Sequence, residues 1–205
     1  RIATMHLNVL ITGAASGLGR GIAMGLTRIG HVVHLTDRDA AGLAQTQRII
    51  CEQTGESASA STRTTIHAVD MRSEAERERL ADALKDQQIG VVINNAGIQH
   101  VARVEELPLE QWDTLLDVML RAPFILTKLL LPGMRARGFG RFINIGSIHS
   151  HVGSPFKSAY VAAKHGLLGL SKVVALETGD AEITMNTICP AFVRTPLVER
   201  QISAL

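Results

Sequence analysis

The sequence predicts an α/β fold with one doubly wound parallel sheet flanked by helices. Short apolar segments alternate with longer helical patterns along the 205 residues, and no linker or internal repeat divides them. Strands joined through helices of this length need right-handed crossovers, which make the strands parallel. A glycine-rich loop also follows the first apolar segment directly, as at a tight strand-to-helix turn. We therefore predict a single domain over residues 1–205.

The elements follow from their patterns in chain order. The strands are the short apolar runs at residues 7–12, 31–36, 64–69, 91–94, 142–145 and 183–188. The helices are the longer segments at 18–29, 39–53, 73–87, 109–137 and 158–177. Gly90 runs straight into Val91, which leaves an unusually tight connection before the fourth strand. Because the chain starts at Arg1 in place of Met, and because of this connection, we expect missing chain, including a C-terminal part.

Composition and charge exclude several classes of protein. A net charge of +2 gives no reason to invoke nucleic acid, and 3% aromatic residues offer no stacking platform for single strands. Cys51 and Cys189 are too few for a disulfide framework and have no metal-ligand spacing, so we expect no metal. No apolar run reaches the roughly 18 residues of a membrane helix. Without a secretory pattern at residues 1–12, we expect a cytoplasmic protein.

The glycine-rich loop is suited to holding a dinucleotide. Its glycines let the backbone approach a pyrophosphate, and the helix that follows offers free N–H groups. The candidate contacts are Gly13, Ser16, Gly17, Leu18 and Gly19. Such a loop is weak support alone, because glycine-rich turns after strands are common.

The residue at the end of the second strand bears on which dinucleotide binds. A carboxylate at Asp37 can accept both ribose hydroxyls of NAD and would repel a 2′-phosphate. It can equally be an ordinary cap for the helix that follows. Arg38 is the one residue that argues for NADP. Because the Asp37 carboxylate disfavours a 2′-phosphate, we predict NAD.

A tyrosine, a lysine and a serine supply the chemistry of an oxidoreductase. Tyr160 and Lys164 are one helical turn apart, and Ser147 lies thirteen residues upstream of the tyrosine. Tyrosine is a poor base because its pKa is about 10, but a nearby lysine and an oxidised nicotinamide should lower that value. Tyr160 would then take an alcohol proton while hydride leaves for the nicotinamide, and Ser147 would hold the same oxygen. A chance pair on a surface helix is the alternative.

Together with Asn94-Asn95-Ala96-Gly97 and Pro190, these motifs resemble the short-chain dehydrogenase/reductase family, in order and over essentially the whole chain. The resemblance implies a Rossmann-type sheet of about seven strands with NAD(P) across its carboxyl edge, and a ribose contact at Lys164. It also implies cofactor contacts at Asp70, Asn94, Ala96, Gly97, Pro190, Phe192, Val193 and Thr195. Since the family commonly pairs helices 109–137 and 158–177 between subunits, we expect a homo-oligomer, a dimer or tetramer.

A second set of residues resembles the substrate site of bacterial D-3-hydroxybutyrate dehydrogenases: Gln99, His149, Lys157, Phe192 and Gln201. Lys157 is cationic, and its polar companions can donate hydrogen bonds, so together they would suit a small anion. Separately, each is explained as a surface or loop residue. The prediction is NAD-dependent interconversion of D-3-hydroxybutyrate and acetoacetate. The alternatives are a sugar, a polyol or an acyl thioester as substrate, or an NAD-binding homologue of low activity.

The sequence departs from the family at three positions. Phe192 stands where the hydroxybutyrate enzymes carry tryptophan, and Ala191 where glycine is usual. Met119 stands where the family has an asparagine that supports a water-mediated proton relay. Pro123 has no N–H for the carbonyl of Met119, which should leave that carbonyl free to hold a water. Our hypothesis is that the relay operates through the backbone of Met119, at a reduced rate.

Overall fold

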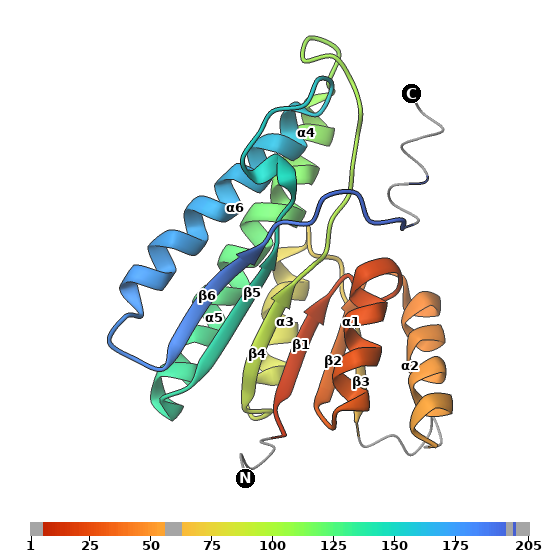
Figure 1. Ribbon diagram of the computed structural model, residues 1–205, viewed down its shortest axis with the longest axis vertical. Coiled ribbons are helices and arrows are strands. Elements are labelled where there is room, and N and C mark those ends of the chain that lie inside the picture. The colour runs from red at the N-terminus through yellow and green to blue at the C-terminus, as the bar shows by residue number, and fades with distance from the viewer. Residues whose placement is uncertain (1–5, 56–62, 196–198, 200–205) are drawn as a thin grey trace.

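The computed structural model describes residues 6–55, 63–195 and 199, and a parallel sheet forms its centre (Figure 1). The sheet has six strands in the order β3-β2-β1-β4-β5-β6. They are β1 (Asn8–Thr12), β2 (Val32–Asp37), β3 (Thr64–Ala68), β4 (Ile89–Asn94), β5 (Gly140–Ile145) and β6 (Ile183–Ile188). All the pairings are parallel. The predicted fold class is confirmed.

Helices lie on both faces of the sheet. The helices α1 (Gly17–Arg28) and α2 (Ala40–Thr54) cover the β1–β3 side of the face turned toward the viewer in Figure 1, and α3 (Glu74–Leu84), α5 (Ala122–Arg137) and α6 (Ser158–Glu177) lie behind the sheet. A shorter helix, α4 (Leu109–Leu116), precedes α5. No helix in the described part of the chain combines the length and hydropathy needed to cross a bilayer.

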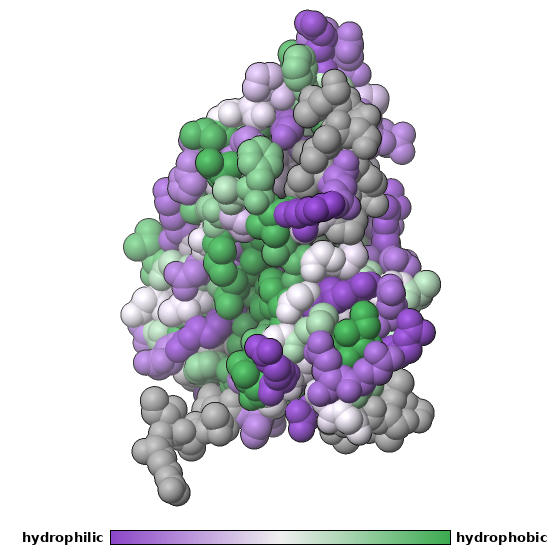
Figure 2. Space-filling view, turned by 45° about the vertical axis from the view of Figure 1, so that its right-hand side comes forward, coloured by the Kyte–Doolittle hydropathy of each residue, from purple (hydrophilic) through white to green (hydrophobic). Residues whose placement is uncertain are grey.

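Two apolar clusters hold the layers together. On β1, Leu10 belongs to the cluster that includes α3 and α5, whereas Val9 and Ile11 belong to the cluster under α1 and α2. Burial on both faces explains why the central strands β1 and β4 are nearly continuous apolar runs. Figure 2 shows apolar side chains gathered in the middle of the face that α1 and α2 only partly cover, and Ile188 of β6 is 53% exposed.

The strand order fixes where a ligand can bind. The chain runs outward from β1 through β2 to β3, then returns to β4 on the other side of β1. The loops after β1 and β4 therefore diverge at the carboxyl edge. In open parallel sheets this switch point forms a crevice that binds ligands.

The predicted helix over 109–137 is interrupted. A π-helical segment, η2 (Asp117–Arg121), lies between α4 and α5, and the N–H of Ala122 donates to the carbonyl of Asp117 five residues back. Pro123, the next residue, has no N–H to donate, so the regular α-helical pattern cannot resume at that position.

The connection before the fourth strand is short. Residues 85–88 join α3 to β4, and Gln88 adopts a left-handed backbone with φ of 48°. The fourth strand begins at Ile89, two residues earlier than predicted, so Gly90 lies within it.

A substitution within the glycine loop tests its packing. A Cβ added at Gly19 would overlap the carbonyl oxygen of Gly13, which is backbone and cannot move aside. Gly19→Ala should therefore lower the free energy of unfolding by about 1–3 kcal/mol in urea titrations. Gly21→Ala is the matched control on the same helix, because its Cβ meets nothing within 4 Å. Equal stability of the two variants would contradict this packing.

Candidate active site

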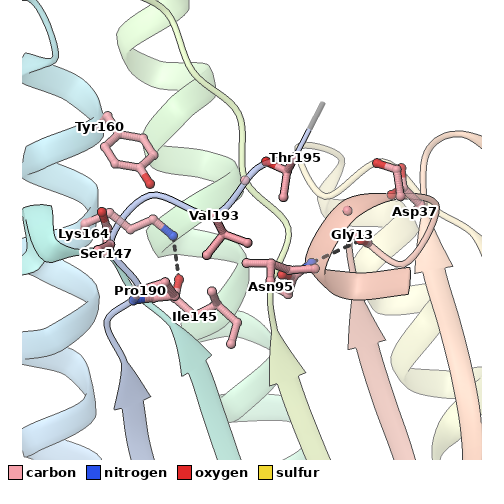
Figure 3. A pocket seen from close by; sticks show the side chains of 16 residues that line it. Gly13, Asp37, Asn95, Ile145, Ser147, Tyr160, Lys164, Pro190, Val193 and Thr195 are labelled. Carbon is pink, nitrogen blue, oxygen red and sulfur yellow. Dashed lines mark hydrogen bonds between the residues drawn. The ribbon is translucent and has the colours of Figure 1, made fainter. Parts of the chain in front are cut away.

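A cleft opens at the carboxyl edge of the sheet (Figure 3). Its walls come from the loop after β1, the ends of β4 and β5, α6 and the segment after β6. They are lined by Gly13, Ser16, Gly17, Leu18, Asp37, Asn95, Gly97, Ile145, Gly146, Ser147, Tyr160, Lys164, Pro190, Ala191, Val193 and Thr195. A second hollow shares Gly13, Asp37 and Gly97 with the first and extends past Asp70 and Arg72. The two hollows therefore form one elongated cleft.

Lys164 lies at the buried end of this cleft. Its side chain is 4% exposed, and Nζ donates a hydrogen bond of 2.6 Å to the carbonyl oxygen of Ile145 at the end of β5 (Figure 3). Burial lowers the pKa of Lys164 from 10.5 to about 8 because the ammonium loses its hydration. Nζ also lies 5.6 Å from the centre of the Tyr160 ring.

Tyr160 points into the cleft from the same helix, beside Ser147 (Figure 3). Burial raises the pKa of Tyr160 above its ordinary value, and a hydrogen bond with Ser147 offsets part of that rise. In the protein alone the net shift in the pKa of Tyr160 is therefore upward, whereas the sequence predicts a lowered pKa with both Lys164 and the oxidised nicotinamide beside the phenol. The physical reason is that desolvation of the phenol outweighs the other contributions, while the Lys164 ammonium donates to Ile145.

Ser147 is fixed by the short 3-10 helix η3 (Ile148–Ser150) that follows β5. Its Oγ accepts a hydrogen bond of 3.2 Å from the N–H of His149, and its own N–H donates to Oγ of Ser150. These reciprocal bonds form a capping box at the start of η3. Ser147, which is 8% exposed, is thus held at the cleft by backbone geometry.

The loops after β1 and β4 are joined by hydrogen bonds. The Oγ1 of Thr12 accepts from the backbone N–H groups of Asn95 and Ala96, and Nδ2 of Asn95 donates to the carbonyls of Thr12 and Gly13. Asn95 also lines the cleft, although the prediction named its neighbour Asn94. The repeated asparagine in residues 94–97 was the only signal for it.

Asp37 anchors the glycine loop from the end of β2. Its Oδ2 accepts a hydrogen bond of 3.2 Å from the N–H of Ala15, and its Oδ1 accepts from the N–H of Asp39. The helix cap considered as an alternative belongs to Asp39, whose side chain accepts from the N–H of Gly42. Asp37 is therefore a residue of the cleft wall and not the cap of α2.

These features fit a nicotinamide dinucleotide. The N-terminus of α1 has no acidic residue in its first turn and no side-chain cap from Ser16, so its free N–H groups and positive dipole end suit a pyrophosphate. Asp37 offers carboxylate oxygens to one ribose, and Lys164 lies at the other end of the cleft near Tyr160. The donors and acceptors thus follow the order of groups along a dinucleotide.

Most of the predicted cofactor residues line the cleft, and three do not. Asn94 is buried and donates to Oδ1 of Asn144 at 2.7 Å, because its side chain points into the sheet interior. Gly19 packs against Gly13. Phe192 is 81% exposed, and Ala191 and Val193 line the cleft in its place. Asp70 and Ala96 line the second hollow.

The predicted substrate residues are only partly brought together. His149 packs edge-to-face on Tyr160, with ring centres 6.1 Å apart. Burial lowers the pKa of His149, and the positive charge of Lys157 lowers it further. The Oε1 of Gln99 accepts from the N–H of His100. Gln201 lies outside the described residues.

Met119 lies in the π-helical segment and is 1% exposed. It packs with Leu115, Val118, Ala159 and Ala163, in a cluster that Tyr160 and Trp112 border. Its Sδ lies 3.8 Å from the position of a Cβ at Gly97, which lines the cleft. The residue therefore supports the site as buried apolar packing.

Residues 7–204 match the family model described as short chain dehydrogenase. The chain belongs to the short-chain dehydrogenase family. Over 201 residues it is 42% identical to D-beta-hydroxybutyrate dehydrogenase of Rhizobium meliloti (strain 1021). The match covers 97% of this chain and 76% of that protein. Membership makes the chain an oxidoreductase that uses NAD(P) on a small molecule. Ser147, Tyr160 and Lys164 line its cleft.

Two solved structures share the fold. One is described as an NAD(P)-dependent gluconate 5-dehydrogenase from Beutenbergia cavernae with NADP bound at low occupancy. It has 29% sequence identity and a TM-score of 0.88, and the match covers 96% of this chain and 76% of that one. The other is 3-ketoacyl-(acyl-carrier-protein) reductase from Brucella melitensis complexed with NADH, with 26% identity and a TM-score of 0.86, over 96% and 80% of the two chains.

The pH dependence of stability tests the burial of Lys164. Its depressed folded-state pKa of about 8 means that the unfolded chain binds more protons between that value and 10.5, so the folded state gains stability as pH rises through this window. Lys164→Met removes this gain. The stability of the wild type relative to the variant should therefore rise by roughly 2 kcal/mol between about pH 7 and pH 9.5.

Urea titrations at the two pH values measure this difference. Lys172→Met, an exposed lysine on the same helix, is the control and should show no such pH dependence. A constant difference between the wild type and Lys164→Met would contradict the lowered pKa.

Proposed function

We propose that this short-chain dehydrogenase interconverts D-3-hydroxybutyrate and acetoacetate with NAD. The observation that carries the substrate assignment is the contact between His149 and Tyr160, with the positive charge of Lys157 close enough to affect the histidine. A neutral imidazole can donate one N–H, and an ammonium can pair with a carboxylate. Both groups therefore favour a short anionic substrate beside the tyrosine. The 42% identity to a D-beta-hydroxybutyrate dehydrogenase supports the same assignment.

Ser147, Tyr160 and Lys164 each have a different role in the oxidation of the substrate alcohol. A bound nicotinamide would supply the acceptor for the hydride of the carbinol carbon. Tyr160 takes the hydroxyl proton at its phenolic oxygen, and Ser147 donates a hydrogen bond to the oxygen that develops negative charge. Lys164 supplies positive charge beneath the ring and a donor for a ribose hydroxyl. Burial raises the pKa of Tyr160 in the protein alone, and the positive charge of an oxidised nicotinamide would favour the phenolate.

The preference for NAD rests on Asp37. A carboxylate that faces the cleft would repel the 2′-phosphate of NADP, and its oxygens can accept ribose hydroxyls. Arg38 lines the adjoining hollow and argues in the other direction. Because the carboxylate is held by two backbone N–H groups at the end of β2, we favour NAD.

A sugar acid or polyol is the alternative substrate class. The similarity to a structure described as a gluconate 5-dehydrogenase supports it. Ala191, which lines the cleft, also stands where glycine is usual. The homo-oligomer and the cytoplasmic location stay proposals too. Exposed apolar residues on α5 and α6, Phe124 at 49% and Val173 at 52%, support pairing of these helices between subunits.

Initial rates with NAD and each enantiomer of 3-hydroxybutyrate test the function. The D form should be turned over at least tenfold faster than the L form, because only one enantiomer can direct its carbinol hydrogen to the nicotinamide while its carboxylate meets Lys157. Tyr160→Phe removes the base and should cost about 100-fold or more in kcat. Strong turnover of gluconate beside weak turnover of both enantiomers would overturn the assignment.

Met119→Asn tests the proton relay. If the relay uses backbone carbonyls of the π-helical segment, the new amide adds nothing to it, and kcat should change by less than about threefold. The smaller polar side chain should still lower stability by about 2 kcal/mol, since Met119 is buried. A rise in kcat of several hundredfold would show that the missing asparagine limits the reaction.

A further inference from the structure

A buried arginine beneath the far end of the cleft has no role in the reaction described above. Arg77, on the first turns of α3, is 1% exposed and is among the largest fully buried side chains. Its Nη1 donates to the backbone carbonyl of Met71, while its Nε has no hydrogen-bond partner among the described residues. A guanidinium this poorly paired is expensive to bury.

Glu76, the residue before Arg77, binds the loop that contains Met71, but as a hydrogen-bond acceptor. Oε2 of Glu76 accepts a hydrogen bond of 2.7 Å from the backbone N–H of Asp70. Ser73 caps α3 by accepting from the N–H of Glu76. Successive residues of one helix thus bind an N–H and a C=O of two successive loop residues. We refer to residues 69–72 as the adenosine loop, because they line the hollow that would hold the adenosine of a dinucleotide.

The adenosine loop forms one wall of the cleft. Val69, Asp70, Met71 and Arg72 all line the hollow that continues from Asp37 away from Tyr160. A dinucleotide whose nicotinamide lies at Tyr160 places its adenosine in this hollow. Arg72 also binds Asp70 through a forked pair, with Nε and Nη2 within 2.9 Å of Oδ2. The orientation of the Asp70–Met71 backbone therefore sets the position of several charged groups on this wall.

Stability alone does not account for Arg77. Replacing a buried charged group by an apolar side chain of similar volume is often neutral or stabilising. The charged groups that act on it, Arg121, Asp117, Glu74 and Asp70, do so only through longer-range electrostatic interactions. A methionine would fill the same space without the desolvation cost. The presence of the guanidinium is instead explained by its hydrogen bond to the backbone carbonyl of Met71.

We propose that Arg77 and Glu76 are positioning residues for the adenosine half of the cofactor, which they orient by fixing the backbone of the adenosine loop from below. The inference rests on the proposed use of a nicotinamide dinucleotide. It does not depend on which alcohol is the substrate.

Calorimetric binding of ADP-ribose, which carries the adenosine half and lacks nicotinamide, is the test. Arg77→Met should raise the Kd for ADP-ribose and the KM for NAD about tenfold, because the loop carbonyl loses its charged donor. The kcat at saturating NAD should stay within about twofold, and the melting temperature should not fall. Arg48→Met, an exposed arginine on α2, should bind ADP-ribose as the wild type does.

Glu76 provides a second variant if Arg77→Met does not fold. Glu76→Ala should also weaken ADP-ribose binding, whereas Glu76→Gln keeps an oxygen acceptor for Asp70 and should restore most of it. Unchanged ADP-ribose affinity in Arg77→Met and Glu76→Ala would overturn the inference, as would loss of affinity only in variants that melt earlier. A wild-type protein that binds neither NADH nor ADP-ribose would instead overturn the proposed function.

Discussion

The hydrogen bond from Nζ of Lys164 to the carbonyl of Ile145 determines the geometry of the active site. It joins α6 to the carboxyl end of β5 at 2.6 Å in a buried environment. Ser147 follows Ile145 by two residues, and Tyr160 precedes Lys164 by one helical turn. A single contact between helix and strand therefore sets the distance between the base and the group that holds the substrate oxygen. Because the ammonium is desolvated, its attraction to the carbonyl of Ile145 also restrains the position of Lys164 at the bottom of the cleft.

The same edge of the sheet organises the cofactor half. Thr12 and Asn95 join the loops that diverge from β1 and β4, and Asp37 holds the glycine loop from β2. The α3 helix holds the loop after β3 through Glu76 and Arg77. Each loop at this edge is thus fixed by a hydrogen bond from a neighbouring element. A long, flexible dinucleotide meets a wall that is largely preorganised, which lowers the cost of binding it.

Sequence reasoning was most successful where function depends on local spacing. The glycine loop, the helical turn between Tyr160 and Lys164, and the alternation of strands and helices are short-range patterns, and each has its predicted place. Effects that arise only from packing were not predictable. The rise in the pKa of Tyr160 comes from burial by distant segments. Pro123 signals an interruption of the long helix, but not that the interruption is π-helical.

Side-chain direction was the other source of error. Asn94 and Asn95 are adjacent and identical in type, yet the pleat of β4 sends the first into the sheet and the chain turns the second toward the cleft. The burial of Arg77 was not expected, because it stands among alternating charges that are typical of a solvated helix. Only the depth of α3 beneath the loop shows that one of these charges is buried.

The central claim is that Tyr160 is a weak acid in the protein alone and becomes a base when the oxidised cofactor binds. Tyr160 is the sole tyrosine of the chain, so an ultraviolet difference titration reports its phenol directly. The account predicts a pKa above the ordinary 10 without cofactor and a clear fall, by about one pH unit or more, with saturating NAD. A phenol that titrates at its ordinary value both with and without NAD would contradict it.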